Sequence, residues 1–333
     1  MTDAIVIGAG HNGLVCAAYL ARAGMDVLIL EASDAAGGMA ASRTISDDYH
    51  FPGLAHVGYP LGKSIRNDLK LEKYGYKPGQ AIDTVALDTK GEHLIIGADA
   101  LSGMGLPETD AAAYPAFKEQ YLAFAKALRP LFGNKPPRLK NMGFADTRTL
   151  ARLGWNIRMG LGKEAMYEFL RVAGVNMYDV LNEAFDDERL KGAIAVDAIM
   201  GSAMGPRTPG TVLTWLQRLQ GELDGPLAGH GGQQLVNALT QSAEDAGATI
   251  RFDAPVEEIL IDRGMAFGVN LVGGEMVKAK LVISSTDPRT TFSSMVGAPR
   301  LDAMFANRVK QIRGAGVVGK LNVALGGLPE FNN

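Results

Sequence analysis

Cysteine is almost absent from this 333-residue sequence. Only Cys16 is present, which excludes an internal disulfide and any C-x-x-C redox or metal pair. An excess of charge of one sign is also lacking, because 33 Lys or Arg stand against 36 Asp or Glu and leave a net charge of −3. Such a balance argues against nucleic acid as a partner. The five histidines show no metal-ligand spacing, so no metal site is predicted.

Long apolar runs are missing as well. No run approaches the ~18 residues that a membrane span needs, and the longest candidate, residues 14–30, is interrupted by Arg22 and Asp26. The N-terminus lacks the basic stretch and the apolar core of a secretory signal. The sequence therefore predicts a chain without a transmembrane segment and with a cytoplasmic location.

Glycine is plentiful instead, with 41 residues, about 12% of the chain against a usual ~7%. Because these glycines follow no collagen-like period, they predict many tight turns. At ~100–200 residues per domain, the length predicts two domains.

The first 31 residues predict a strand–helix–strand unit. Residues 4–8 form a β-branched apolar run, residues 12–23 carry a small-residue apolar face ended by Gly24, and residues 27–30 form a second apolar run. Two strands joined by a helix over about 30 residues are expected to be parallel.

A G-x-G-x-x-G motif joins the first strand to the helix, at Gly8, Gly10 and Gly13. The first glycine suits a tight turn, the second a close approach to a pyrophosphate and the third close packing of helix on strand. Glu31, 18 residues beyond Gly13, stands where a carboxylate accepts ribose hydroxyls, and it would repel a 2′-phosphate. The alternative is a structural glycine turn with a solvated Glu31. The context favours a dinucleotide site.

The later pattern predicts that this domain is built from distant pieces. A hairpin is expected at 84–88 and 93–96, a helix at 110–132 and further helices over 147–220. From about 229 onward we expect a helix starting at Gly231-Gly232, strands at 249–252 and 281–283, and a meander at 256–261, 265–271 and 275–278. The fold class is therefore α/β: a Rossmann-like domain with a parallel sheet plus β-meander, and an inserted α+β domain. The predicted boundaries are 1–75 and 225–292 for the first domain, and 76–224 and 293–333 for the second.

The paired glycines Gly37-Gly38 and this late return of the sheet favour a flavin over a nicotinamide ligand. With the run from Ala4 to Val15, with Leu30-Glu31 and with the run from Ser284 to Pro288, the sequence resembles FAD-dependent oxidoreductases of the phytoene desaturase and amine oxidase superfamily. The resemblance implies FAD as cofactor. It implies these cofactor-binding residues: Gly8, Gly10, Asn12, Gly13, Glu31, Ala32, Gly37, Gly38, Met39, Val256, Ser285 and Thr286. Val256, expected to offer its backbone to the adenine, is equally well explained as an ordinary core strand residue.

The resemblance also implies the activity. We expect the flavin to accept a hydride from an apolar or isoprenoid-like small molecule held by the inserted domain. An amine or amino-acid oxidase of the same fold and a non-catalytic flavin-binding regulatory protein are the alternatives. The family's second flavin-contacting glycine motif is missing after an expected strand at 321–325, which predicts a C-terminally truncated fragment. No residue is singled out as a catalytic acid or base, and His56 is interpreted as structural. No oligomeric state is indicated.

Two further stretches have competing interpretations. Residues 186–188 (Asp-Asp-Glu) are typical of a solvated helix turn and not of a metal site. Residues 152–163 combine Trp155 and Met159 with basic side chains, so this helix could lie on a membrane surface. Packing between parts of the protein is the commoner use of such a helix.

Overall fold

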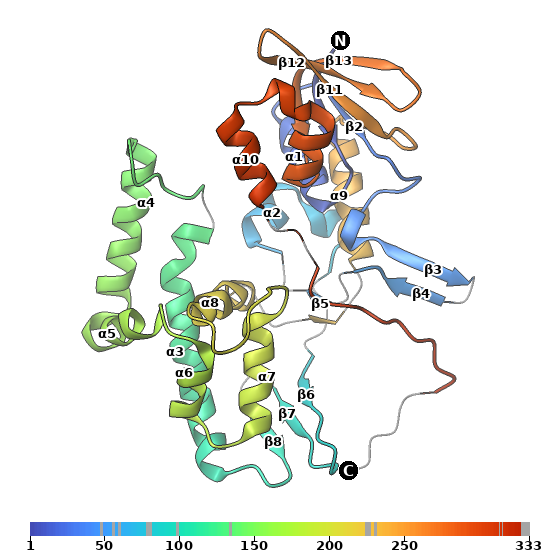
Figure 1. Cartoon of the computed structure of the whole chain (residues 1–333). Coiled ribbons are helices and arrows are strands. Elements are labelled where there is room, and N and C mark those ends of the chain that lie inside the picture. The colour runs from blue at the N-terminus through green and yellow to red at the C-terminus, as the bar shows by residue number, and fades with distance from the viewer. Residues whose placement is uncertain are drawn as a thin grey trace. The chain divides into compact units, whose positions relative to one another are not determined.

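The computed structural model describes residues 1–46, 49–54, 57–58, 61–77, 82–97, 100–132, 135–223, 228–229, 232–312, 314 and 316–327. The chain divides into two compact units (Figure 1). Unit 1 comprises Met1–Gly79 and Gly229–Ala315, and unit 2 comprises Gln80–Ala228 and Gly316–Asn333. The α/β class expected from the sequence is confirmed.

A six-stranded sheet forms the centre of unit 1. Its strands are β1 (Thr2–Ile7), β2 (Val27–Leu30), β10 (Thr249–Arg251), β11 (Val256–Asp262), β12 (Met265–Leu271) and β13 (Met276–Ser284). They lie in the order β10-β2-β1-β13-β12-β11. The first four of these are parallel, and β13, β12 and β11 form an antiparallel meander. Unit 1 is thus a Rossmann-like sheet with a meander at one end.

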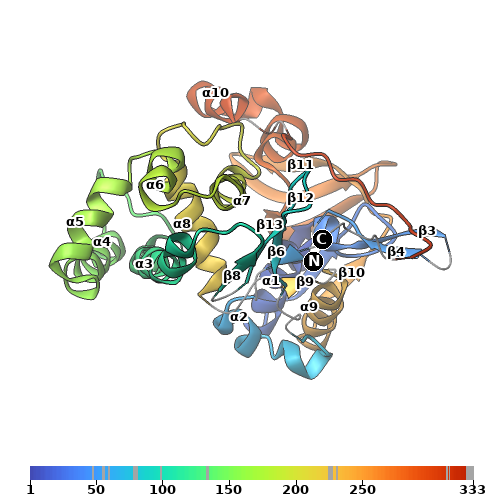
Figure 2. The same ribbon diagram turned by 90° about the horizontal axis from the view of Figure 1, so that it is seen from below.

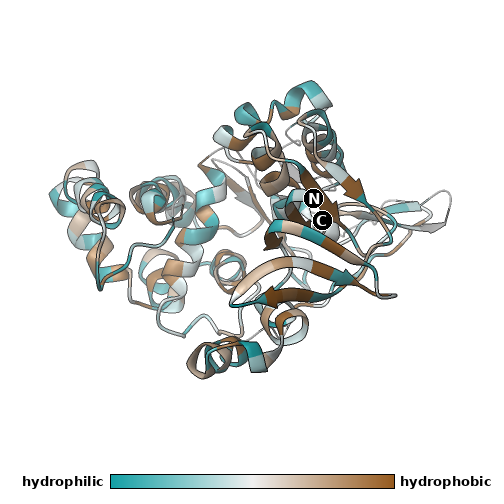
Figure 3. Ribbon diagram, turned by 90° about the horizontal axis from the view of Figure 1, so that it is seen from above, coloured by the Kyte–Doolittle hydropathy of each residue, from teal (hydrophilic) through white to brown (hydrophobic). Residues whose placement is uncertain are grey.

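The residues of β1 alternate between two apolar cores. Ala4 and Val6 pack with α1 (His11–Arg22) and α9 (Gln233–Asp245) on one face of the sheet. Ile5 and Ile7 pack with the meander on the other face. Because all four are buried, the strand is a continuous apolar run, as is typical of a parallel sheet covered on both sides. In Figure 3 the strands near the N-terminus accordingly carry the colour of hydrophobic residues.

Strand β13 corrects one sequence expectation. Residues 275–278 and 281–283 were expected to be two strands, but Met276–Ser284 is one strand of nine residues. Its first half pairs antiparallel with β12 (Gly268 with Lys278), and its second half pairs parallel with β1 (Val6 with Ile283). One long strand therefore joins the meander to the parallel sheet, and no turn interrupts it.

The remaining elements of unit 1 lie around this sheet. They are η1 (Gly38–Ala40), β3 (Ser42–Ser46), β4 (Tyr49–Pro52), β5 (Val57–Gly58), α2 (Lys63–Asp68), η2 (Leu71–Tyr74), η4 (Arg289–Gly297), η5 (Ala298–Arg300) and α10 (Ala303–Gln311). The predicted boundary at residue 292 is wrong, because residues 293–315 belong to unit 1. Met295 and Val296 of η4 are buried in the core beneath the meander, which fixes this segment to the first unit.

Unit 2 is mainly helical. Its helices are α3 (Glu108–Phe132), α4 (Phe144–Trp155), the π-helical η3 (Asn156–Gly160), α5 (Gly162–Val172), α6 (Met177–Ala184), α7 (Glu188–Ile199) and α8 (Thr211–Glu222) (Figure 2). Three short antiparallel strands complete it: β6 (Thr84–Ala86), β7 (Leu94–Ile96) and β8 (Leu101–Gly103). The two-residue β9 (Ala228–Gly229) stands where the chain returns to unit 1.

Aromatic residues fill the core of unit 2. Phe117 and Tyr121 of α3 contact Trp215 of α8, with ring centroids 5.8 and 5.0 Å apart. The step of four between Phe117 and Tyr121 is the periodicity that predicted the helix at 110–132. The expected strand at 321–325 is wrong: these residues have no regular secondary structure and pair with no strand among the described residues, and Leu321 is 85% exposed.

Candidate cofactor site

The loop between β1 and α1 carries the three motif glycines, and each has a different environment. Gly8 has φ = +94°, a conformation that favours glycine, so it makes the turn. A Cβ added to Gly13 would lie 2.0 Å from the carbonyl oxygen of Gly8, so only glycine lets the helix sit this close to the loop. A Cβ added to Gly10 would meet no protein atom within 4 Å, although Gly10 is the residue before α1. Gly10 therefore borders open space at a helix N-terminus.

Glu31 follows β2 and reaches back to this loop. One carboxylate oxygen, Oε2, accepts the backbone N–H of Ala9 at 2.6 Å, and the other, Oε1, accepts the backbone N–H of Ser33 at 3.0 Å. An ionised carboxylate has about four acceptor positions. Two acceptor positions therefore remain on this carboxylate, as many as the two hydroxyls of an unphosphorylated ribose could use.

The loop that contains Gly37-Gly38 contacts the loop between β1 and α1. The N–H of Gly37 donates to the carbonyl oxygen of Ala9 at 2.9 Å, and Gly37 and Gly10 form a bridge of the parallel type. Gly37 and Gly38 have φ values of +129° and +55°, and a Cβ on Gly38 would lie 3.3 Å from the Cα of Gly10. The paired glycines thus permit a backbone approach that other residues would obstruct.

A cavity of about 310 Å³ opens beside both loops, within the usual range of ligand pockets. It is lined by Ile7, Gly8, Gly10, His11, Asn12, Leu30, Glu31, Ala32, Gly38, Met39, Pro255, Val256, Ser285, Thr286 and Met295. All twelve cofactor-binding residues expected from the sequence except Gly13 and Gly37 are among these. Gly13 and Gly37 lie behind the lining, where they allow the close packing described above. Binding roles for the twelve remain predictions.

Ser285 and Thr286 line the cavity, and their hydroxyls form hydrogen bonds with other groups of the protein. The Ser285 hydroxyl donates toward the carbonyl oxygens of Ile7 and Gly8, at 2.9 and 3.1 Å. The Thr286 hydroxyl lies 2.8 Å from that of Ser284 and 2.9 Å from that of Thr291, which are themselves 2.8 Å apart. Ser285 thereby joins β13 to the glycine loop, and the three other hydroxyls form a closed group beside the cavity.

Several lining residues were not predicted. Ile7 and Leu30 are the last residues of β1 and β2, and the rule that ligands bind at the carboxyl ends of parallel strands could have found them. His11 belongs to the motif but was interpreted only as a loop contact. Met295 comes from η4, far along the sequence, and no local signal marks it. His56 and Gly231 lie outside the described residues.

These features fit the FAD expected from the sequence. A pyrophosphate needs room and backbone N–H groups, and both exist where Gly10 borders open space at the N-terminus of α1. A ribose needs a carboxylate with free acceptor positions, which Glu31 provides. Ile7, Leu30 and Met295 supply apolar wall. Among the described residues no group of three His, Cys, Asp or Glu could hold a metal ion.

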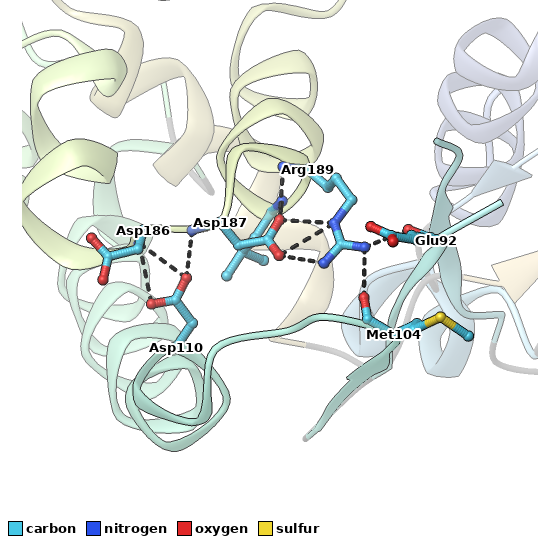
Figure 4. Close-up of polar contacts among 7 residues, drawn as sticks. Glu92, Met104, Asp110, Asp186, Asp187 and Arg189 are labelled. Atoms are coloured by element: carbon cyan, nitrogen blue, oxygen red, sulfur yellow. Dashed lines mark hydrogen bonds and ion pairs between the residues drawn. The ribbon is translucent and has the colours of Figure 1, made fainter. Parts of the chain in front are cut away.

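A second polar cluster lies in unit 2, around residues interpreted from the sequence as a solvated turn (Figure 4). That interpretation is wrong for Asp187, whose side chain is 5% exposed. Asp187 accepts the N–H groups of Arg189 and Leu190 at the start of α7 and pairs with the Arg189 guanidinium at 2.5 Å. The buried Asp110 carboxylate accepts the N–H groups of Asp186 and Asp187. Arg189 also donates to the carbonyls of Glu92 and Met104, so the cluster connects α3, α7 and the small sheet.

Comparison with known proteins places the chain in a family. The model of the "Flavin containing amine oxidoreductase" family matches residues 13–325. The chain is 30% identical to "Pyridine nucleotide-disulfide oxidoreductase domain-containing protein 2" of Rattus norvegicus, over 99% of this chain and 61% of that protein. It is 28% identical to a hydroxyneurosporene desaturase of Cereibacter sphaeroides, over 92% of this chain and 60% of that enzyme.

A likeness in fold accompanies these matches. The structure of putrescine oxidase bound to putrescine superposes with a TM-score of 0.58 at 18% identity, covering 93% of this chain and 63% of that one. In length, the chain spans about three fifths of the curated relatives named above. No helix in the described part of the chain is long and apolar enough to cross a membrane. The chain belongs to the family of flavin-containing amine oxidoreductases, and FAD is its cofactor.

Proposed function

We propose that this chain forms the FAD-binding part, and a portion of the substrate-binding part, of an oxidoreductase that takes a hydride from an apolar or isoprenoid-like small molecule. FAD binding, the first part of this proposal, is supported by the open space beside Gly10 at the start of α1. Glu31, which lines the same cavity, keeps acceptor positions free. The apolar or isoprenoid-like substrate, the second part of this proposal, is supported by the 28% identity to a hydroxyneurosporene desaturase over 92% of the chain.

Different residues of unit 1 would bind different parts of FAD. Gly10 and the N-terminus of α1 would hold the pyrophosphate, and Glu31 the adenosine ribose. Ala32, Met39 and Val256 would border the rest of the cavity. When bound, FAD supplies a hydride acceptor that no amino-acid side chain provides. The protein's part is to hold that group and to keep water from it.

The second candidate is an amine or amino-acid oxidase, which the family description and the fold of putrescine oxidase favour. A third is a flavin-binding regulatory protein without catalysis, in which the cavity would serve only to fix a conformation. A cytoplasmic location accompanies the proposal as a prediction from the sequence. Fractionation of the expressing cells tests the location directly.

Anaerobic reduction of the bound flavin separates the three. We expect the purified protein to be yellow, and its visible absorbance to bleach with isoprenoid alkenes and not with diamines or amino acids. Bleaching by a diamine alone would replace the first candidate with the second. A yellow protein that no substrate reduces would favour the regulatory protein. A colourless protein that binds no added FAD would refute the first part of the proposal.

A further inference from the structure

Helix α4 and the adjoining η3 present an apolar stripe to solvent in unit 2. Phe144, Trp155 and Met159 are 87%, 67% and 58% exposed. Their separations of eleven and four residues put them on one side of a helix. Exposing a large aromatic side chain to water is unfavourable, so a stripe of three marks a surface that meets something apolar.

The other side of the same helix is already packed. Leu153, Ile157 and Leu161 contact the aromatic core of unit 2. Packing within the protein, the commoner use of such a helix, therefore explains these three residues but not the stripe. The helix has two apolar faces, and only one of them is covered among the described residues.

Arginines flank the stripe. Arg148 follows Phe144 by four residues, and Arg152 and Arg158 each stand three residues from Trp155, so all three lie next to it on the helix surface. All are exposed. Within the described part of the chain no ion pair or side-chain hydrogen bond involves any of them. Their charges are free for a partner.

The charge of the surrounding segment is strongly uneven. Residues 135–163 contain seven Lys or Arg and one acid, a net charge of +6 in a chain whose total is −3. The single acid, Asp146, accepts the N–H groups of Gly143 and Arg138 at 2.8 and 3.1 Å, which lowers the pKa of its carboxyl. The segment therefore attracts an anionic partner.

We propose that this surface, comprising Phe144, Arg148, Arg152, Trp155, Arg158 and Met159, binds the headgroup layer of an anionic lipid bilayer. A helix that lies in such a layer needs aromatic and aliphatic side chains that enter the acyl boundary and long cations beside them that reach the phosphates. A convex helical stripe with arginines at its margin has this form. The proposal stands apart from the flavin site, and it would bring an apolar substrate within reach only if the proposed function holds.

Flotation with lipid vesicles tests the proposal on the 333-residue chain. We expect the chain to float with vesicles that mix phosphatidylglycerol and phosphatidylcholine and to stay behind with phosphatidylcholine alone. High salt should release it, because screening weakens the attraction of arginine to phosphate. Equal binding to both kinds of vesicle, or binding to neither, would overturn the proposal.

Variants assign the binding to the stripe. Replacing Arg148, Arg152 and Arg158 by glutamine should lower the partition coefficient about fivefold for each arginine, on the order of a hundredfold in all. The exposed Arg22 and Arg263 of unit 1, replaced in the same way, are the matched control. W155A with M159A should also weaken binding, whereas M265A with M304A, at similarly exposed positions of unit 1, should not. An equal loss in the control variants would overturn the assignment.

Tryptophan emission gives an independent measurement. Trp155 is exposed and Trp215 is 6% exposed, so a blue shift on adding anionic vesicles should disappear in W155F. Size-exclusion chromatography without lipid tests two other occupants. Self-association through Trp155, or co-elution with an acidic protein that displaces the vesicles, would replace the bilayer by a protein partner.

Discussion

The carboxylate of Glu31 accepts the backbone N–H of Ala9 at 2.6 Å, so the residue after β2 holds the loop that follows β1. The same carboxylate accepts the N–H of Ser33, which fixes its orientation. Glu31 therefore has two tasks in the proposed site: it positions the glycine loop, and it keeps acceptor positions toward the cavity. A substitution there should affect both the loop and the ligand.

Replacing Glu31 by alanine should weaken FAD binding by about 1.5–3 kcal/mol for each hydrogen bond lost to the charged carboxylate. Glutamine at the same position should fall between, because its carbonyl oxygen keeps two acceptor positions while its NH2 group can only donate. Titration of flavin-free protein with FAD, followed by fluorescence, measures both. The exposed Glu244 of α9, replaced by alanine, is the control. Unchanged affinity in E31A would place the ribose elsewhere.

An added methyl group should lower stability at Gly13 and FAD affinity at Gly10. In G13A the Cβ would lie 2.0 Å from the Gly8 oxygen, so the free energy of unfolding should fall by about 1–3 kcal/mol or more, with or without FAD. In G10A the methyl group enters open space, and φ = −67° suits alanine, so stability without FAD should stay within about 1 kcal/mol. FAD affinity should nevertheless drop in G10A, because the methyl group would occupy the place that we propose for the pyrophosphate.

Chemical denaturation of the flavin-free variants measures the first effect, and FAD titration measures the second. If G10A bound FAD as tightly as the unaltered protein, the cavity beside Gly10 would not be the pyrophosphate site. That outcome would leave the structural role of Gly13 intact, so the two roles are tested separately.

Ser285 should matter for the order of the glycine loop more than for FAD affinity. Its hydroxyl is the donor to the carbonyls of Ile7 and Gly8, and S285A should cost about 0.5–1.5 kcal/mol of stability. Hydrogen exchange at the backbone amides of residues 8–10 should become faster. The exposed Ser294 of η4, replaced by alanine, should leave both quantities unchanged. A loss of FAD affinity larger than that of E31A would instead give the hydroxyl a direct role.

The start of unit 1 was predictable because its signals are local. The strand, the glycine loop and the helix lie within the first 31 residues, and each glycine has a steric reason that its spacing already indicates. Ten of the twelve expected residues line one cavity, and their binding roles stay predictions. The other two, Gly13 and Gly37, do not line the cavity; Gly13 has the packing role that its place in the motif predicted, whereas the contact of Gly37 with Ala41 and Val236 joins distant parts of the chain.

Other features depend on contacts between distant parts of the chain. Lys278 pairs across to β12 and Ile283 to β1, and only the presence of both partners makes Met276–Ser284 one strand. Met295 reaches the cavity because η4 packs beneath the meander. Conversely, residues 321–325 have the composition of a strand but no partner among the described residues. A strand pattern alone does not form a strand, because its backbone groups need a neighbour.

The buried pair of Asp187 and Arg189 should make unit 2 sensitive to acid. Hydrogen bonds from the Arg189 guanidinium lower the pKa of the Asp187 carboxyl, and N–H groups at the start of α7 lower it further. Because the folded-state pKa lies below the unfolded value of ~3.9, this stabilisation is present in full above about pH 4 and is lost as the pH falls through the folded-state value. Asp187→Asn should therefore cost on the order of 3 kcal/mol at neutral pH, and the difference from the unaltered protein should shrink below about pH 4.

Denaturant unfolding across this pH range, followed by the near-ultraviolet signal of Trp215 in the core of unit 2, measures the difference. The exposed Asp83, replaced by asparagine, should show no comparable difference at any pH. A difference for Asp187→Asn that stayed constant down to about pH 3 would mean that the charge of Asp187 does not carry the stabilisation. The cost would then come from hydrogen bonds to the N–H groups of Arg189 and Leu190 that the neutral amide makes less well, and not from the charge.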